Sequence, residues 1–281
     1  MTNPNQLISI IIPVFNESES IGYLLDEVLN VMCSNKLNFE IVVVNDGSQD
    51  STSNVLDELT IKIKELSVIS LRTNYGQTAA MAAGFDNSNG EVVITLDGDL
   101  QNDPTDIPKL ISHINEGYDL ICGWRYDRKD KLINRRIPSK IANKLIANVT
   151  GLKLHDYGCS LKAFKKEILD DIKLYGELHR FLPVLAKIEG AKIKEIKVNH
   201  RSRKYGSSKY GIDRTFRVLM DLLTVWFMTK FLTRPMYGFG FVGIISILIS
   251  LGMTSYLFIL KLLGNDIGNR PLLMFALILG I

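Results

Sequence analysis

Residues Glu91–Asp99 read EVVITLDGD, an apolar run that ends in two aspartates separated by a glycine. β-Branched and apolar residues predict a strand over Glu91–Asp97 that is buried on both faces of a parallel sheet. Since residues i and i+2 of a strand share one face, the carboxylates of Asp97 and Asp99 are expected to aim at one point. Such hard oxygen ligands suit Mg²⁺ or Mn²⁺ held jointly with phosphate oxygens. The alternative is a pair of solvated turn aspartates.

Other segments of the same kind precede and follow this run. They are Ile8–Phe15, Glu40–Asp46, Val68–Arg72 and Asp119–Trp124, separated by stretches with helical spacing. The alternation predicts an α/β fold with a mostly parallel, Rossmann-like sheet and helices on both faces. Ligands of such sheets bind beyond the carboxyl ends of the strands. Those ends are polar or acidic here, so we expect them to line one crevice: Asn16-Glu17, Asn45-Asp46, Arg72-Thr73-Asn74 and Asp97-Gly98-Asp99.

Asp46 follows residues that should be buried, Ile41–Val44. A carboxylate at a strand terminus can accept hydrogen bonds from a base N–H or a ribose hydroxyl, and Glu17 could do the same. The alternative for this turn is capping of the next helix by Asp46 or Ser48.

The carboxyl-terminal part has a different character. Pro235–Leu260 is a run of 26 residues without charge. About 20 residues suffice to cross the roughly 30 Å hydrocarbon core, so we predict a transmembrane helix over 235–262. The apolar segment 271–281 is too short to cross, and we interpret it as the start of a truncated second span, with a re-entrant tail as the alternative. Phe216–Thr233 carries a narrow polar stripe and predicts an interfacial helix over 213–234. An ordinary core helix is the alternative there.

Charge and cysteine content limit the function classes. The net charge is only +3, but basic residues dominate Arg201–Arg234. Basic residues beside a span favour anionic headgroups and the cytoplasmic side, although a solvated charged face is the alternative. Nucleic acid is not expected as a partner, because the basic stretch runs into a membrane anchor. The three cysteines fit neither a metal spacing nor a disulfide framework, which indicates reduced thiols: Cys33, Cys122 and Cys159.

Five motifs occur in one order: IIPVFNE, VVVNDGSQDST, NYGQTAAMAAGFD, LDGDLQNDP and HRSRKYGSSKYG. Together they resemble the family 2 glycosyltransferases with the GT-A fold. More closely, they are similar to polyprenyl-phosphate glycosyltransferases of the dolichyl-phosphate mannose synthase and undecaprenyl-phosphate glucosyltransferase type. The resemblance covers about Ser9–Tyr210, and the catalytic domain is expected over 1–212.

The resemblance assigns roles to particular residues. It implies a nucleotide-sugar site of Pro13, Glu17, Asp46, Asp97 and Gln101, with Asp97 and Asp99 as ligands of Mg²⁺ or Mn²⁺. It further implies that Asp156 lies near the acceptor and acts in catalysis with Asp99. A basic loop that contacts phosphates is implied for Arg201, Arg203 and Lys209. Asp156 as a simple turn residue before Gly158 is the alternative.

The implied reaction transfers a hexose from a nucleotide sugar to polyprenyl phosphate with inversion. UDP-glucose is the favoured donor and GDP-mannose the second. A phosphate monoester has a second pKa near ~6, so it is largely dianionic at pH 7 and barely needs a base. The enzyme is expected on the inner (plasma) membrane with a cytoplasmic catalytic domain, and a homo-oligomer is compatible with this picture.

Two other functions compete with this interpretation. A processive polysaccharide synthase usually carries a QxxRW motif, and Trp124-Arg125 lacks the preceding glutamine. An inactive membrane-anchored binding or scaffold protein would be favoured by loss of the acidic strand ends. Those acids are all present: Glu17, Asp46, Asp97 and Asp99.

Overall fold

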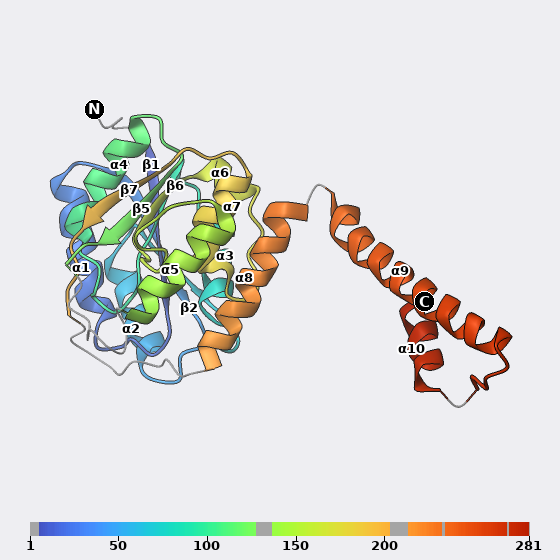
Figure 1. Cartoon of the computed structure of the whole chain (residues 1–281). Helices are drawn as coiled ribbons and strands as arrows, with labels where there is room; N and C mark the ends of the chain where they lie inside the picture. Colours follow the sequence, from blue (N-terminus) through green and yellow to red (C-terminus); the bar gives the residue numbers. More distant parts are fainter. Residues whose placement is uncertain (1–5, 128–136, 203–212, 232–233, 269, 281) are drawn as a thin grey trace. The chain divides into compact units, whose positions relative to one another are not determined.

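A computed structural model describes residues 6–127, 137–202, 213–231, 234–268 and 270–280 (Figure 1). The chain divides into two compact units, Met1–Val225 and Trp226–Ile281. The first unit is built on a seven-stranded sheet and holds the strand-end residues.

The strands lie in the order β3-β2-β1-β4-β6-β5-β7. β6 runs antiparallel to β4 and β5, and the other neighbouring pairs are parallel. The carboxyl ends of six strands and the amino end of β6 therefore meet at one edge, and the predicted mostly parallel sheet is confirmed. The strand bounds are β1 Leu7–Val14, β2 Asn38–Asn45, β3 Leu66–Ser70, β4 Val92–Thr95, β5 Leu120–Arg125, β6 Lys162–Lys165 and β7 Ile193–Val198.

Two hydrophobic clusters cover the two faces of the sheet. Alternation along β1 divides its side chains, so that Ile10 and Ile12 join one cluster and Ile11 joins the other. The first cluster packs against α1 Ile21–Ser34, α2 Thr52–Lys62 and α4 Ile107–Asn115. The second packs against α3 Gln77–Asp86, α6 Lys166–Asp170 and α7 Leu182–Ile188. Among the described residues of this unit, the other helical segments before α8 are α5 Ile137–Thr150 and the 3-10 turns η1 Pro104–Asp106 and η3 Leu178–Phe181.

Two sequence-based predictions about strands need correction. β4 ends at Thr95, so Asp97 and Asp99 lie in the following turn and do not share a strand face. β6 and β7 were not predicted at all. Their sequences, KAFK and IKEIKV, place charged residues where a buried strand would be apolar.

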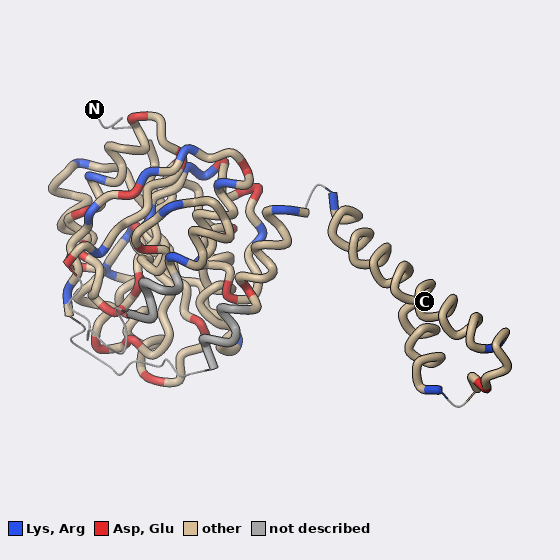
Figure 2. Tube along the Cα trace, viewed as in Figure 1, with Lys and Arg blue, Asp and Glu red and all other residues tan. Residues whose placement is uncertain are grey.

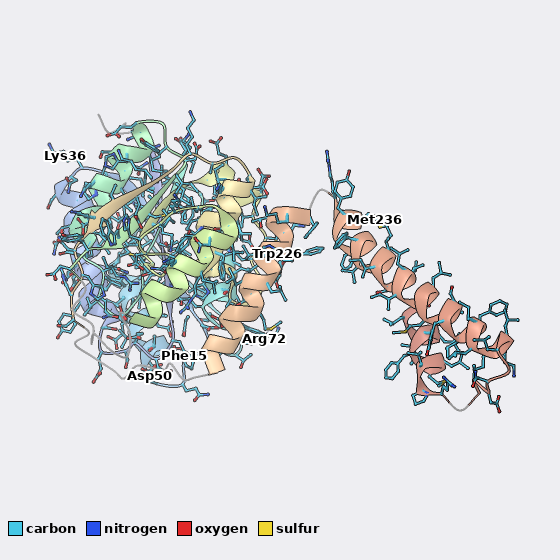
Figure 3. The ribbon with its side chains drawn as sticks, viewed as in Figure 1. Phe15, Lys36, Asp50, Arg72, Trp226 and Met236 are labelled. Carbon is cyan, nitrogen blue, oxygen red and sulfur yellow. The ribbon has the colours of Figure 1, made fainter. Side chains whose placement is uncertain are left out.

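The carboxyl-terminal helices are α8 Asp213–Phe231, α9 Pro235–Leu262 and α10 Pro271–Gly280. In the described parts of the chain, α9 is the helix that is long and apolar enough to cross a membrane. Figure 2 shows no charged residue on it between Arg234 and Lys261. Ser250 of α9 donates a 2.7 Å hydrogen bond to the carbonyl oxygen of Ala276 in α10, so the two helices pack side by side. Figure 3 labels Trp226 and Met236, two of the exposed apolar side chains of this unit.

The middle of α8 has features of both a core helix and an interfacial helix. Leu222 and Val225 are buried, as in a core helix, whereas Met220 and Leu223 are exposed. An exposed apolar face of this kind is what an interfacial helix presents to lipid.

Candidate active site

The loops that follow β1 and β2 form one wall of the site. Asn16, with a φ of 54°, donates its backbone N–H to Ser48 Oγ over 2.9 Å, and its Oδ1 accepts the N–H of Gln49 over 2.7 Å. The N–H of Glu17 bonds to Thr52 Oγ1 over 3.0 Å. Figure 3 shows Phe15, Asp50 and Arg72 toward this end of the unit and Lys36, which precedes β2, at the opposite end. The predicted gathering of strand ends is confirmed.

Asp46, which is 3% exposed, joins the end of β2 to the start of α3. Its two carboxylate oxygens accept the backbone N–H groups of Tyr75 and Gly76 over 2.7 and 2.9 Å. Burial raises the pKa of Asp46, and these two hydrogen bonds only partly offset that effect. Gly47, at φ 66°, allows close contact, because a Cβ there would lie 2.4 Å from the carbonyl carbon of Thr73.

Capping of α2 by Asp46 or Ser48, the alternative considered for this turn, does not occur. The N–H of Thr52 at the start of α2 bonds instead to Asp50 Oδ1 over 3.0 Å. Asp46 therefore organises the loop before α3, and its contact with a nucleotide stays a prediction.

The Asp97-Gly98-Asp99 turn packs against the end of β1. A Cβ on Gly98 would lie 2.8 Å from Cγ1 of Val14 and 3.6 Å from the carbonyl oxygen of Pro13, so only glycine permits this approach. Glu17, whose Oε2 accepts the Ser20 hydroxyl over 2.9 Å, borders the same turn. The structure thus brings Pro13 and Glu17 together with the two aspartates.

The two aspartates differ in their partners. Asp97 Oδ1 accepts the side-chain amide of Gln77 over 2.8 Å, and Asp99 Oδ1 accepts the N–H of Gln101 over 3.1 Å. Leu100 has a φ of 62°, an unusual conformation for a bulky side chain that marks a constrained turn. Within the described residues no cluster of three or more His, Cys, Asp and Glu side chains occurs. The hard oxygens of Asp97 and Asp99 fit a Mg²⁺ or Mn²⁺ ion that takes its other ligands from phosphate and water.

Gln101 and Arg201 bond to each other across the site. The N–H of Arg201 donates to Gln101 O over 2.9 Å. The Arg201 guanidinium binds Glu27 over 2.6 Å and Asp103 over 2.9 Å. Burial lowers the pKa of Arg201, but its bonds to Glu27 and Asp103 outweigh burial, and the pKa lies above its ordinary value. In this structure the guanidinium therefore ties the segment after β7 to α1 and to the residue before η1, and its predicted contact with phosphate stays a prediction.

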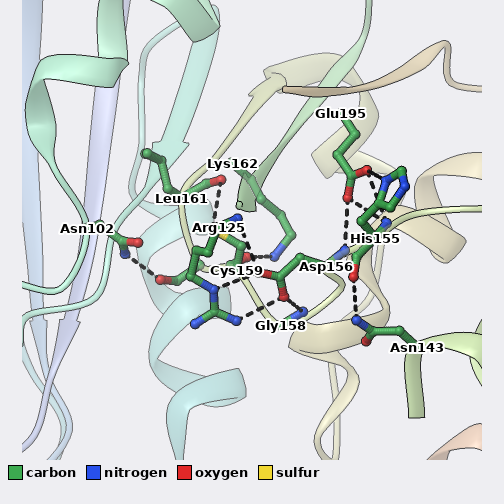
Figure 4. Close-up of polar contacts among 11 residues, drawn as sticks. Asn102, Arg125, Asn143, His155, Asp156, Gly158, Cys159, Leu161, Lys162 and Glu195 are labelled. Atoms are coloured by element: carbon green, nitrogen blue, oxygen red, sulfur yellow. Dashed lines mark hydrogen bonds and ion pairs between the residues drawn. The ribbon is translucent and has the colours of Figure 1, made fainter. Parts of the chain in front are cut away.

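Arg125, at the end of β5, is a site residue that sequence reasoning missed. Its Nε and Nη2 donate to the two carboxylate oxygens of Asp156 over 2.7 and 2.9 Å, which makes a bidentate ion pair (Figure 4). The two side chains are 16% and 3% exposed. Burial lowers the pKa of Arg125, but the bonds to Asp156 outweigh it and keep the pKa above its ordinary value. The position of Arg125 after an apolar strand was the signal that could have found it.

Asp156 therefore pairs with Arg125, and its predicted role near the acceptor stays a prediction. Its Oδ1 also accepts the N–H of Gly158 over 3.2 Å, which is the geometry of the turn considered as its alternative. The predicted phosphate ligands Arg203 and Lys209 lie outside the described residues.

All three cysteines are free thiols in this structure. Burial raises the pKa of Cys122 to about 12 and that of Cys159 to about 11, so both thiols stay protonated. Cys33 is exposed on α1.

The sheet, the aspartate turn and the acidic strand ends define a glycosyltransferase with a GT-A fold. Residues 9–173 match the model of the family described as glycosyl transferase family 2, and the chain belongs to this family.

Two similar proteins support this assignment. The dodecaprenyl-phosphate galacturonate synthase of Rhizobium johnstonii is 44% identical and aligns over 97% of this chain and 82% of its own length. An undecaprenyl-phosphate 4-deoxy-4-formamido-L-arabinose transferase of Pseudomonas fluorescens is 39% identical over 86% of this chain and 71% of its own. The predicted resemblance to polyprenyl-phosphate sugar transferases is thereby confirmed.

A solved structure shares the fold. Glucosyl-3-phosphoglycerate synthase of Mycobacterium tuberculosis, crystallised with Mn²⁺ and UDP-glucose, superposes with a TM-score of 0.62 at 17% identity. The match covers 80% of this chain and 79% of that one.

Proposed function

We propose that this enzyme transfers one sugar residue from a nucleoside diphosphate sugar to the phosphate of a polyprenyl lipid, with inversion at the anomeric carbon. One observation carries the proposal. The acidic turn of Asp97 and Asp99 and the Arg125–Asp156 pair lie on the same edge of the sheet, in a chain that continues into the candidate span α9. Relatives that act on polyprenyl phosphates support it.

The donor half of the site consists of acids. Asp97 and Asp99 would hold Mg²⁺ or Mn²⁺ together with the diphosphate, and such an ion neutralises charge on the departing group. Asp46, Glu17, Pro13 and Gln101 would surround the nucleotide. The structural relatives that bind UDP with Mn²⁺ or Mg²⁺ support this arrangement.

The acceptor half needs positive charge more than a base. A dianionic lipid phosphate is already nucleophilic, and its oxygen forms the new bond to the anomeric carbon while the bond to the diphosphate breaks and the electron pair leaves with it. Both carboxylate oxygens of Asp156 accept hydrogen bonds from Arg125, so its proposed role is to hold that cation in place. The Nη1 edge of Arg125, which does not bond to Asp156, is proposed to meet the phosphate. Arg203 and Lys209 remain candidate phosphate ligands, and so does Arg201 if it leaves Glu27 and Asp103.

The identity of the sugar is tested by a donor panel. UDP-glucose and GDP-mannose are the choices from sequence, and the named relatives add galacturonate and 4-deoxy-4-formamido-L-arabinose donors. The detergent-solubilised chain is incubated with each donor and with undecaprenyl, dodecaprenyl or dolichyl phosphate, and lipid products are identified by mass. One donor is expected to add one sugar residue to a polyprenyl phosphate. If no donor is transferred to any of these lipids, the proposal fails.

The catalytic domain is proposed to face the cytoplasm from the inner membrane. Basic residues before the uncharged run Pro235–Leu260 outnumber those that follow it: Arg214, Arg217, Lys230 and Arg234 against Lys261 and Arg270. That asymmetry satisfies the positive-inside rule. Protease should cut the domain in inverted vesicles and spare it in right-side-out vesicles, and the reverse pattern would contradict this orientation.

A further inference from the structure

We propose that Glu195 of β7 is a positioning residue for this transfer, because it fixes the backbone that carries Asp156. The inference rests on the proposed function. It concerns a residue that neither the sequence motifs nor the strand-end acids include.

Glu195 binds two consecutive peptide groups with one carboxylate. Its Oε1 accepts the backbone N–H of His155 over 2.8 Å and that of Asp156 over 2.9 Å. Its Oε2 lies 2.6 Å from Nδ1 of His155. The Glu195 side chain is only 10% exposed, whereas the side chain of His155 is 66% exposed. Residues 155 and 156 belong to neither a helix nor a strand, so regular secondary structure supplies no acceptor for their backbone N–H groups. The Glu195 carboxylate supplies that acceptor instead.

Fixing the backbone of Asp156 also fixes Arg125, because Arg125 bonds to the Asp156 carboxylate. Asp156 can hold both Nε and Nη2 of Arg125 only while its own backbone stays in place. β5 and β7 are parallel neighbours in which Cys122 pairs with Glu195, so the rigid sheet carries both ends of this chain of contacts. Figure 4 shows Glu195 and Arg125 on opposite sides of the turn that contains Asp156.

Two further contacts hold the same turn and provide controls. The ring of His155 stacks on Trp124 with centroids 4.1 Å apart and planes inclined by 14°. Asn143 of α5 donates its side-chain amide to the carbonyl oxygen of His155 over 2.6 Å. Replacing His155 by alanine removes the ring contacts but leaves both backbone N–H bonds to Glu195.

The test uses the full chain in detergent with the donor that the panel identifies. Glu195→Ala is expected to lower kcat/KM for polyprenyl phosphate by about 10- to 100-fold, because displacement of a reacting group by about 1 Å has effects of this size. The KM for the donor should not change. Glu195→Gln should restore most activity, since one amide oxygen can accept both backbone N–H groups. Glu195→Asp, with its shorter side chain, should behave like alanine and serves if the alanine protein does not fold.

Matched controls separate positioning from a general loss of stability. Glu116 also bonds to a histidine, His113, and to Lys194 of β7, but it is 51% exposed and lies away from the site. Glu116→Ala should keep wild-type kinetics. His155→Ala should cost less activity than Glu195→Ala, because it keeps both backbone N–H bonds to Glu195. In an Asp156→Asn background, Glu195→Ala should cause no further loss. If the two effects multiply instead, or if Glu195→Ala transfers at the wild-type rate, the inference is wrong.

Amide hydrogen exchange distinguishes this inference from the proposed function. Exchange at His155 and Asp156 should be faster in the Glu195→Ala protein whatever sugar or acceptor the enzyme uses, and unchanged exchange would overturn the inference. A wild-type protein that transfers nothing to any polyprenyl phosphate would contradict the proposed function, and the exchange result would still decide the role of Glu195.

Discussion

The side-chain amide of Gln77, the first residue of α3, donates a 2.8 Å hydrogen bond to Oδ1 of Asp97. The same stretch of chain is held by Asp46, which accepts the N–H groups of Tyr75 and Gly76. One segment therefore connects the acid at the end of β2 to the aspartate turn after β4. The two acids proposed for the nucleotide and the metal are oriented together.

Gln77→Ala should weaken metal binding without unfolding the protein. A hydrogen bond to a charged group contributes about 1.5–3 kcal/mol, so the Mn²⁺ concentration for half-maximal activity should rise about tenfold or more. Gln49→Ala, at an exposed position on the same edge, is the control and should leave that concentration unchanged. An unchanged Mn²⁺ requirement in Gln77→Ala would show that the bond does not orient Asp97.

Arg125→Ala should strongly destabilise the protein. Removing one partner of a buried pair leaves an uncompensated charge, and the free energy of unfolding should fall by about 3–5 kcal/mol in a urea titration. The double variant Arg125→Ala/Asp156→Ala should recover a substantial part of this loss, since it removes the stranded carboxylate as well. Simple addition of the two single effects would argue against the pair.

Glu40 predicts a pH dependence of stability. Burial raises its pKa, but bonds from the Ser9 hydroxyl and from Asn89 outweigh burial and hold the pKa below its ordinary value of 4.5. A carboxylate with a lowered folded pKa stabilises the fold fully above the unfolded pKa, and this contribution is lost as pH falls through the folded value. Wild type should therefore be more stable than Glu40→Gln at pH 7 by about 1 kcal/mol.

Thermal or urea unfolding from pH 7 down to pH 3 tests this sign. The advantage of wild type over Glu40→Gln should shrink below pH 4.5. An advantage that grows as the pH falls would contradict the assignment of a lowered pKa.

The apolar strands were predictable because each is buried on both faces. Ile8–Phe15 and Glu40–Asp46 were expected, and β1 and β2 lie at Leu7–Val14 and Asn38–Asn45. β6 was not predictable in the same way. Its Lys162 is 3% exposed and donates to the carbonyl oxygen of Cys159, so a lysine occupies a position where the sequence pattern demands an apolar residue.

The candidate site likewise has residues that the sequence predicts and residues that it does not. The strand-end acids were predictable because parallel strands bring their carboxyl ends to one edge, whatever the loops do. Partners from distant segments were not: Arg125 meets Asp156 across 31 positions, and Arg201 meets Glu27 across 174. Such pairings depend on the antiparallel insertion of β6 and on the exit of β7, which no local pattern indicates.

The central claim is metal-assisted transfer of a sugar to polyprenyl phosphate through the Asp97-Gly98-Asp99 turn. The most direct test measures sugar incorporation into the lipid by the detergent-solubilised wild type and by Asp99→Ala, each with Mn²⁺ or with EDTA. Product is expected only from wild type with the metal, while Asp99→Ala keeps the wild-type melting temperature. Full turnover by Asp99→Ala in EDTA would contradict it.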